Sequence, residues 1–150
     1  MAFEIEHKYL VINDSYKNLA TGKVEIEQGY LNRNPDRTVR IRILGDKGFL
    51  TVKSRNHGAK RLEFEYEIPV EEAREIIKLS EPGIVKKTRY FVPYDRQMWE
   101  VDEFHDSLQG VTVAEVELPD VEHCYQKPPF VGEDITGNPA FYNSNLKACH

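Results

Sequence analysis

The sequence predicts an α+β protein in which an antiparallel β-sheet or barrel dominates over a few short helices. Charged and apolar residues alternate with a period of two in most charge-rich segments, which is the pattern of a strand with two different faces. Segments rich in Gly, Pro, Asn and Asp separate several of these stretches at hairpin spacing. Many short strands connected in this way are typical of an antiparallel sheet or barrel.

About eight strands are expected from the N-terminus onward. Their centres lie at residues 4–9, 24–31, 39–43, 50–53, 62–68, 87–90, 99–102 and 114–118. Turn-rich pieces at 32–36, 45–48 and 55–58 separate several of the strands. On nearly every strand one face carries Glu, Asp, Lys or Arg, and few Thr, Ser or Gln residues share that face.

The clearest helix is expected over residues 70–79, because Pro69 precedes this segment and Pro82 and Gly83 follow it. Weaker helical patterns lie at 15–19, 122–126 and 141–147. The chain contains no internal repeat, low-complexity segment or linker, so residues 1–150 are expected to form one domain.

The composition excludes several classes of protein. Hydrophobic residues make up 40% and charged residues 30% of the chain, which indicates a globular rather than a disordered protein. No apolar run approaches the roughly 18 residues of a membrane span, so we expect a cytoplasmic protein with no membrane partner. The net charge of -5 disfavours binding to a nucleic acid duplex. Cys124 and Cys149 have no CxxC or Cys/His spacing, so neither a zinc site nor a disulfide framework is expected.

The charged faces have two interpretations. On a single strand, charges are ordinary because one face of an antiparallel sheet is often in water. Here nearly every strand carries them, and they would converge on a tunnel if the sheet closed with its apolar face outward. Such convergence costs free energy unless opposite charges, metals or ligands compensate it, so the pattern favours a binding site.

An ordered set of motifs identifies a family. The segment Glu4-Ile5-Glu6-His7-Lys8 is an ExExK motif. It is followed by Gln28-Gly29-Tyr30-Leu31, Val39-Arg40-Ile41-Arg42, Thr51-Val52-Lys53, Arg61-Leu62-Glu63-Phe64-Glu65, Lys87-Thr88-Arg89, Trp99-Glu100-Val101-Asp102, Ala114-Glu115-Val116-Glu117-Leu118, Ile135-Thr136-Gly137 and Tyr142-Asn143-Ser144. Across essentially the whole chain this order resembles the CYTH superfamily, also called triphosphate tunnel metalloenzymes.

The resemblance implies a closed eight-stranded antiparallel β-barrel with flanking helices and a triphosphate inside it. It also implies a short bacterial-type member that hydrolyses inorganic triphosphate. For the oligomeric state, monomer and homodimer both stay open. Other members of the superfamily act on thiamine triphosphate or RNA 5′-triphosphates, or convert ATP to cyclic AMP as adenylate cyclases.

Two sets of charged residues would share the work of binding. Six cations would bind the phosphate chain, and the arginines can hold phosphate oxygens in a forked geometry; they are Lys8, Arg40, Arg42, Lys53, Lys87 and Arg89. Carboxylates beside a phosphate chain call for Mg²⁺ or Mn²⁺. By resemblance the metal ligands are Glu4, Glu6, Glu115 and Glu117, with Asp102 as a helper.

The expected catalytic residues are Lys8, Tyr30, Glu63 and Glu65. Lys8 and Tyr30 match a Lys/Tyr pair that related phosphatases place near the reacting phosphate, although Tyr30 could equally be core filler. Glu63 and Glu65 match acidic positions that hold a second metal or orient the attacking water. No nucleophilic Ser or Cys is required for this hydrolysis.

The remaining charged and aromatic residues leave alternatives open. By the alternation of their strands, Glu67 and Glu100 fall on the same inward face as the expected site residues. Glu67 is expected near the tunnel mouth, paired with a surface lysine or arginine. His7 and His105 are expected to be structural. An adenylate cyclase would need an adenine pocket, for which the candidates are Phe49, Phe91, Tyr94 and Phe104. A thiamine triphosphatase would need an aromatic platform, and a polyphosphate- or nucleotide-binding module would not need the acidic residues.

Overall fold

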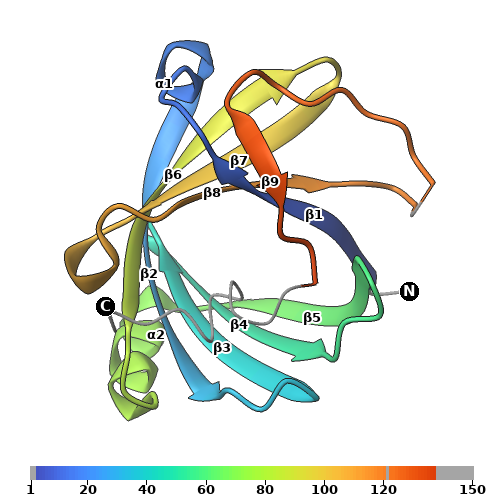
Figure 1. Ribbon diagram of the computed structural model, residues 1–150. Helices are drawn as coiled ribbons and strands as arrows, with labels where there is room; N and C mark the ends of the chain where they lie inside the picture. Colours follow the sequence, from blue (N-terminus) through green and yellow to red (C-terminus); the bar gives the residue numbers. More distant parts are fainter. Residues whose placement is uncertain (1–2, 121, 138–150) are drawn as a thin grey trace.

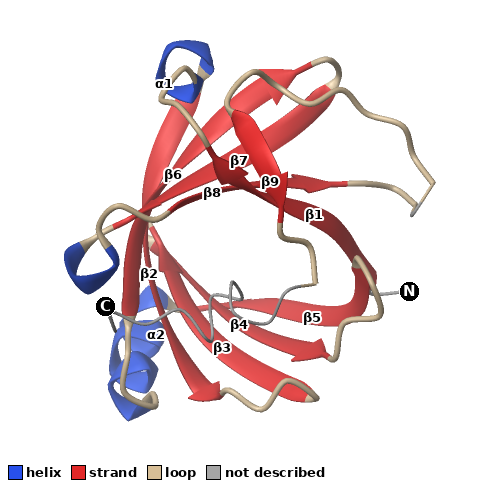
Figure 2. Ribbon diagram, viewed as in Figure 1, coloured by secondary structure: helices blue, strands red, loops and turns tan. Residues whose placement is uncertain are grey.

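The computed structural model describes residues 3–120 and 122–137, and in this part of the chain nine strands form one sheet, eight of which close into a barrel (Figures 1 and 2). The strands are β1 (Phe3–Val11), β2 (Gly22–Asn32), β3 (Arg37–Leu44), β4 (Lys47–Ser54), β5 (Lys60–Ile68), β6 (Val85–Tyr94), β7 (Gln97–Phe104), β8 (Thr112–Glu117) and β9 (Val131–Asp134). The helices are α1 (Tyr16–Leu19) and α2 (Val70–Ile76), with 3₁₀ turns η1 (Ile77–Leu79) and η2 (Asp106–Leu108).

The sheet closes through its first strand. Its order is β5-β4-β3-β2-β6-β7-β8-β1-β9, and every pairing is antiparallel. Residues 3–5 of β1 pair with β5, whereas residues 6–10 pair with β8, so β1 joins the two ends of the sheet. The predicted closed eight-stranded barrel is therefore confirmed, and β9 adds an unpredicted strand beside β1.

The helix predictions have different outcomes. The helix expected at 70–79 is present as α2 followed by η1, and the one expected at 15–19 is the single turn α1. The prediction at 122–126 is wrong, because no residue of this segment is helical. The prediction at 141–147 lies outside the described residues. Within the described residues, no helix has the length and apolar character needed to cross a membrane.

Aromatic residues cover the outer face of β1, β7 and β8. Trp99 and Phe130 are fully buried, and their ring centroids lie 6.5 Å apart. Tyr16 of α1 packs edge-on against Phe130 at 5.8 Å, and Tyr125 lies 5.9 Å from Trp99. The segment before β9 is thus held on the barrel by hydrophobic packing rather than by sheet pairing.

Helix α2 covers a second part of the exterior, over β3 and β4. Ala73 is fully buried there and packs with Ile41 and Ile77. Gly48 of β4 makes the close approach possible, since a Cβ at this position would lie 2.5 Å from the Cβ of Ala73.

The inward-facing positions change from charged to apolar toward one end of the barrel. At this end the inward residues are Leu10, Val85, Phe104 and Val113, and they pack into one cluster with Leu108, Val111 and Ile135. The cluster fills the interior at this end, so the charged side chains are confined to the remainder of the barrel.

We predict that replacing Phe130 with alanine lowers the free energy of unfolding by about 3–5 kcal/mol, because it leaves a cavity among well-packed aromatic rings. Urea unfolding followed by tryptophan fluorescence measures this loss. The matched control is Tyr66→Ala on β5, whose side chain is 59% exposed and whose loss should change stability by no more than about 0.5 kcal/mol. An equal effect of the two variants would contradict the packing role assigned to Phe130.

Candidate active site

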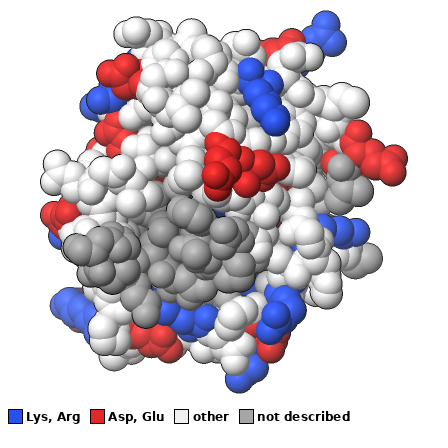
Figure 3. Space-filling view, in the orientation of Figure 1, with Lys and Arg blue, Asp and Glu red and all other residues white. Residues whose placement is uncertain are grey.

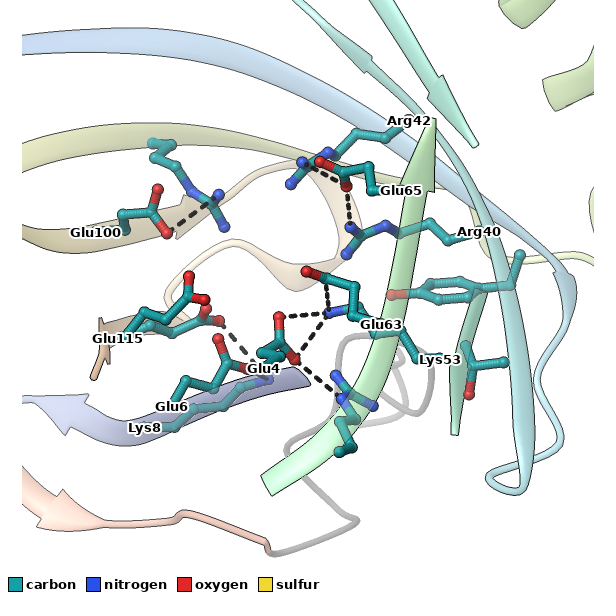
Figure 4. A pocket seen from close by; sticks show the side chains of 15 residues that line it. Glu4, Glu6, Lys8, Arg40, Arg42, Lys53, Glu63, Glu65, Glu100 and Glu115 are labelled. Carbon is teal, nitrogen blue, oxygen red and sulfur yellow. Dashed lines mark hydrogen bonds and ion pairs between the residues drawn. The ribbon is translucent and has the colours of Figure 1, made fainter. Parts of the chain in front are cut away.

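The charged end of the barrel encloses a cavity of about 230 Å³. Its lining is Glu4, Glu6, Lys8, Tyr30, Thr38, Arg40, Arg42, Lys53, Arg61, Glu63, Glu65, Arg89, Glu100, Glu115 and Glu117. Figure 4 shows these side chains reaching into one space from strands on opposite sides of the barrel. On the face in Figure 3, by contrast, acidic and basic residues are scattered among uncharged ones.

Arginines from β3 dominate one wall. Strand register places Arg40 opposite Tyr30 on β2 and opposite Thr51 on β4. The Arg40 and Arg42 guanidinium groups both contact Glu65, at 3.4 and 3.2 Å. Burial, together with the positive charges of Arg40 and Arg89, lowers the pKa of Arg42 to about 10. This wall therefore holds more positive charge than its carboxylates neutralise, which suits an anion.

A second group of residues, on β1 and β8, is short of positive charge. The Lys8 ammonium lies 3.7 Å from Glu6 and 3.6 Å from Glu115, so two carboxylates share one cation. Burial and the negative charges of Glu115 and Glu4 raise the pKa of Glu6 to about 8. Burial likewise raises the pKa of Glu117, which stands opposite Glu6 in the β1–β8 register. Glu6 and Glu117 therefore favour either a proton or an added cation, whereas at Glu115 burial is outweighed by Lys8 and Arg89, which hold its pKa well below the usual range.

Glu4 is a carboxylate of the cavity whose charge is compensated by direct cation contacts. Its oxygens accept hydrogen bonds from Lys53 at 3.1 Å and from Arg61 at 3.0 Å. Burial would raise the pKa of Glu4, but these two cations outweigh it and hold the pKa well below its usual range. Lys53 also contacts Glu63 at 3.1 Å, which links β4, β1 and β5 across the closure of the barrel.

The donor set fits a hard divalent cation in its chemistry. Thirteen of the fifteen lining residues are charged, seven of them glutamates and six of them lysines or arginines. A triphosphate bound here adds several negative charges, so electroneutrality calls for a cation beside it. Among the described residues no three acidic or histidine side chains already form a metal cluster. Mg²⁺ matches this arrangement, because it usually takes one or two carboxylates and completes its shell with water and phosphate oxygens.

Two expected site residues lie apart from the cavity lining. Lys87 and Asp102 form a fully buried ion pair of 2.7 Å, and Arg89 donates two hydrogen bonds to Asp102, at 2.8 and 2.9 Å. The Lys87 ammonium also lies 5.4 Å from the ring of Phe104 in the apolar cluster. Neither residue belongs to the cavity lining, and Asp102 already binds two cations, so the roles expected for Lys87 as a substrate ligand and Asp102 as a metal helper stay predictions.

Sequence reasoning also missed a contributor. Arg61 lines the cavity and binds Glu4, although the sequence identified it only as part of a motif and not as a ligand. Arg61 lies two residues before Glu63 on β5, so the alternation already placed both side chains on the same face of the strand. Glu100, for which parity was the only argument, does line the cavity and contacts Arg89 at 3.4 Å, whereas Glu67 is exposed and lies outside the lining.

The histidines and most aromatic candidates lie elsewhere. His7 faces outward and packs 5.6 Å from the ring of Tyr125, and His105 contacts Thr88 at 2.6 Å. Phe104 belongs to the apolar cluster, and Phe49 packs behind Arg42. Of the described residues that line the cavity, Tyr30 alone is aromatic.

Comparisons with known proteins agree with this geometry. An inorganic triphosphatase from Acetivibrio thermocellus is 47% identical over 147 residues, which are 97% of this chain and 94% of that protein. An inorganic triphosphatase from Nitrosomonas europaea is 33% identical and covers 95% of both chains. The crystal structure of an inorganic triphosphatase matches with a TM-score of 0.68 and 30% identity, and covers 100% of this chain and 97% of that one. The CYTH domain model matches residues 2–142, and the chain therefore belongs to the CYTH domain family.

Proposed function

We propose that this protein hydrolyses inorganic triphosphate to diphosphate and phosphate with the help of Mg²⁺ or Mn²⁺. The observation that carries the proposal is the enclosed cavity, in which an arginine-rich wall faces carboxylates that are short of positive charge. The relatives named inorganic triphosphatase support it, and triphosphatases of this family are in general metal-dependent.

The arginine and lysine side chains bind the triphosphate and stabilise the charge that develops during hydrolysis. Arg40, Arg42 and Arg89 bind phosphate oxygens and neutralise the charge that moves onto the leaving diphosphate. Lys8 and Lys53 bind from the opposite side, where each also anchors a carboxylate. These groups are fixed before substrate arrives because they are already ion-paired within the barrel.

The carboxylates would hold the metal and the water. Glu6, Glu115 and Glu117 are the proposed metal ligands, with Glu4 beside them. The metal would supply charge neutralisation at phosphate oxygens and a more acidic bound water. Glu63 is the proposed residue that orients the attacking water, because burial raises its pKa toward the range that suits a general base. Glu65, bound by Arg40, Arg42 and Thr51, instead holds the arginine wall in place.

The lining favours an unsubstituted triphosphate over ATP or thiamine triphosphate. An adenine or thiazole ring needs an apolar or aromatic surface. The described lining has only Tyr30, whose side chain is 3% exposed, and its other members are charged residues and Thr38. Adenylate cyclase activity therefore ranks below triphosphatase activity and is the second candidate.

The test is phosphate release from inorganic triphosphate, ATP and thiamine triphosphate, each with Mg²⁺, Mn²⁺ or EDTA, alongside an assay for cyclic AMP. We expect fast release from inorganic triphosphate that EDTA abolishes, with at least about 100-fold lower kcat/KM for ATP. Formation of cyclic AMP and diphosphate would replace the proposal with the cyclase. Tight triphosphate binding without turnover would leave a binding module.

A further inference from the structure

Gln28 is a buried polar residue next to the cavity that the mechanism above does not use. It occupies an inward-facing position of β2, between Arg42 on β3 and Val85 on β6. Its side chain is 0% exposed and is not part of the cavity lining. It therefore stands at the border between the charged cavity and the apolar cluster.

The amide of Gln28 makes one specific contact. Its Nε2 donates a hydrogen bond of 3.2 Å to the hydroxyl oxygen of Tyr30. Its Oε1 has no hydrogen-bond partner among the described residues. A buried amide that is only half satisfied is less stable than an apolar side chain of the same size. Its presence is explained if the contact with Tyr30 is needed for function.

The ring of Tyr30 is held firmly at the cavity wall. The Arg33 guanidinium lies 5.3 Å from the centroid of the ring, and Arg33 is itself bound to the carbonyl oxygen of Gly83 at 3.0 Å and to Glu81 at 3.4 Å. Strand register places Arg40 directly opposite. With the ring fixed, the remaining freedom of the hydroxyl group is the direction of its proton.

We propose that Gln28 is a positioning residue that keeps the Tyr30 hydroxyl as a hydrogen-bond donor toward a phosphate oxygen of the substrate. A hydroxyl group has one proton and two lone pairs. When Nε2 of Gln28 occupies a lone pair, the proton is free to point into the cavity. The reverse amide orientation would take the proton and leave a lone pair facing the phosphate. The proposal rests on the triphosphatase function proposed above.

The charge around Gln28 explains why the amide keeps this orientation. Arg42 lies opposite Gln28 in register, and its buried Nε has no hydrogen-bond partner among the described residues. A cationic neighbour favours the amide oxygen on its own side. The amide nitrogen is then directed toward Tyr30.

The experiment is a double-mutant cycle of Gln28→Met and Tyr30→Phe. Methionine keeps the length of glutamine without its hydrogen bond. The readouts are kcat/KM for inorganic triphosphate with Mg²⁺ and, by calorimetry in EDTA, the Kd of metal-free triphosphate. We expect each single variant to weaken both readouts by about 10- to 100-fold, since a hydrogen bond to a charged group is lost. The double variant should match Tyr30→Phe, because Gln28 acts only through that hydroxyl.

The control is Gln97→Met on β7, which removes a glutamine contact with His123 outside the cavity and should leave both readouts at the wild-type value. Additive losses in the double variant would overturn the positioning role, and so would a Kd and kcat/KM of Gln28→Met equal to those of the wild type. If the wild-type protein hydrolyses triphosphate, the triphosphatase proposal stands in either case. If the wild-type protein binds triphosphate without hydrolysing it, only the proposed function is overturned. The double-mutant cycle measured on Kd then still tests the role of Gln28. Failure of the wild type to bind triphosphate at all would overturn both.

Discussion

Replacement of Glu6 by glutamine is expected to reduce metal-dependent triphosphate hydrolysis by at least about 100-fold, which exceeds the usual effect of removing a residue that only supports a metal ligand. Glu6 shares the Lys8 ammonium with Glu115, and burial together with the charges of Glu115 and Glu4 leaves Glu6 under-compensated. Its oxygens are therefore the ones that a divalent cation would relieve most. Steady-state kinetics over a range of Mg²⁺ concentrations measures the loss.

The same replacement is expected to make the metal-free protein more stable at alkaline pH. The pKa of Glu6 is raised from 4.5 to about 8, so the folded protein keeps a proton that the unfolded chain releases. Between these pH values the folded state binds more protons, and wild-type stability therefore falls as pH rises. Glutamine cannot ionise, so the advantage of the variant should grow through this window and be largest above about pH 8. A gain on the order of 1 kcal/mol would raise Tm by roughly 2–4 °C.

Thermal unfolding in EDTA at pH 6 and pH 9 separates this prediction from a general effect of removing a charge. The control is Glu75→Gln on α2, whose carboxylate pairs with Lys78 in solvent. It should change neither turnover nor the pH dependence of Tm. A Glu6→Gln enzyme with wild-type turnover would rule out the role of Glu6 in metal binding.

The alternation of the sequence predicted which face of each strand is inside the barrel. Antiparallel pairing preserves this parity around the sheet, because a residue and its cross-strand partner point to the same face. Residues as distant in sequence as Glu4, Arg40 and Glu115 could therefore be assigned to one cavity from the sequence alone. Alternation alone does not say whether the sheet closes into a barrel. That prediction came from the resemblance of the ordered motifs to the family.

Parity could not predict how deep each residue lies within the barrel. Lys87 and Arg89 share one face of β6, but Arg89 lines the cavity whereas Lys87 lies against Phe104. The depth of a residue depends on the stagger of all strands in the closed sheet, which local sequence does not encode. Arg61 was missed for the related reason that its contact with Glu4 forms only across the β1–β5 closure.

The ninth strand was missed because its sequence disfavours strand structure. It contains only four residues, Val-Gly-Glu-Asp, and Gly and Asp are depleted in strands. Gly132 is nevertheless suited to its place, since a Cβ there would lie 2.4 Å from Ile12 Cγ2 and 3.2 Å from the carbonyl oxygen of Leu10. Tertiary packing against β1 thus decides the conformation of this segment.

Replacement of Asp102 by asparagine is expected to lower the free energy of unfolding by about 3–5 kcal/mol, because it removes the carboxylate charge that two buried cations bind. Lys87 and Arg89 both bind the Asp102 carboxylate, and all three side chains are less than a tenth exposed. Burial already lowers the pKa of Lys87 to about 8, against the pull of Asp102. Wild-type stability should therefore rise with pH between about 8 and 10.5, where the unfolded chain binds more protons. In the variant this rise should begin at lower pH.

Urea unfolding at pH 6, 7.5 and 9 distinguishes this structural role from metal ligation. Adding Lys87→Met to Asp102→Asn should recover part of the lost stability, because it removes one of the two cations that the Asp102 carboxylate had neutralised. The control Asp36→Asn breaks an exposed pair with Arg55 and should leave the unfolding midpoint unchanged. If Asp102 were a metal ligand, Asp102→Asn would instead keep the stability of the metal-free protein and lose only affinity for Mg²⁺. The bidentate bond from Arg89 and the contact with Lys87 argue against that outcome, since a metal would have to displace two cations from a carboxylate they already neutralise.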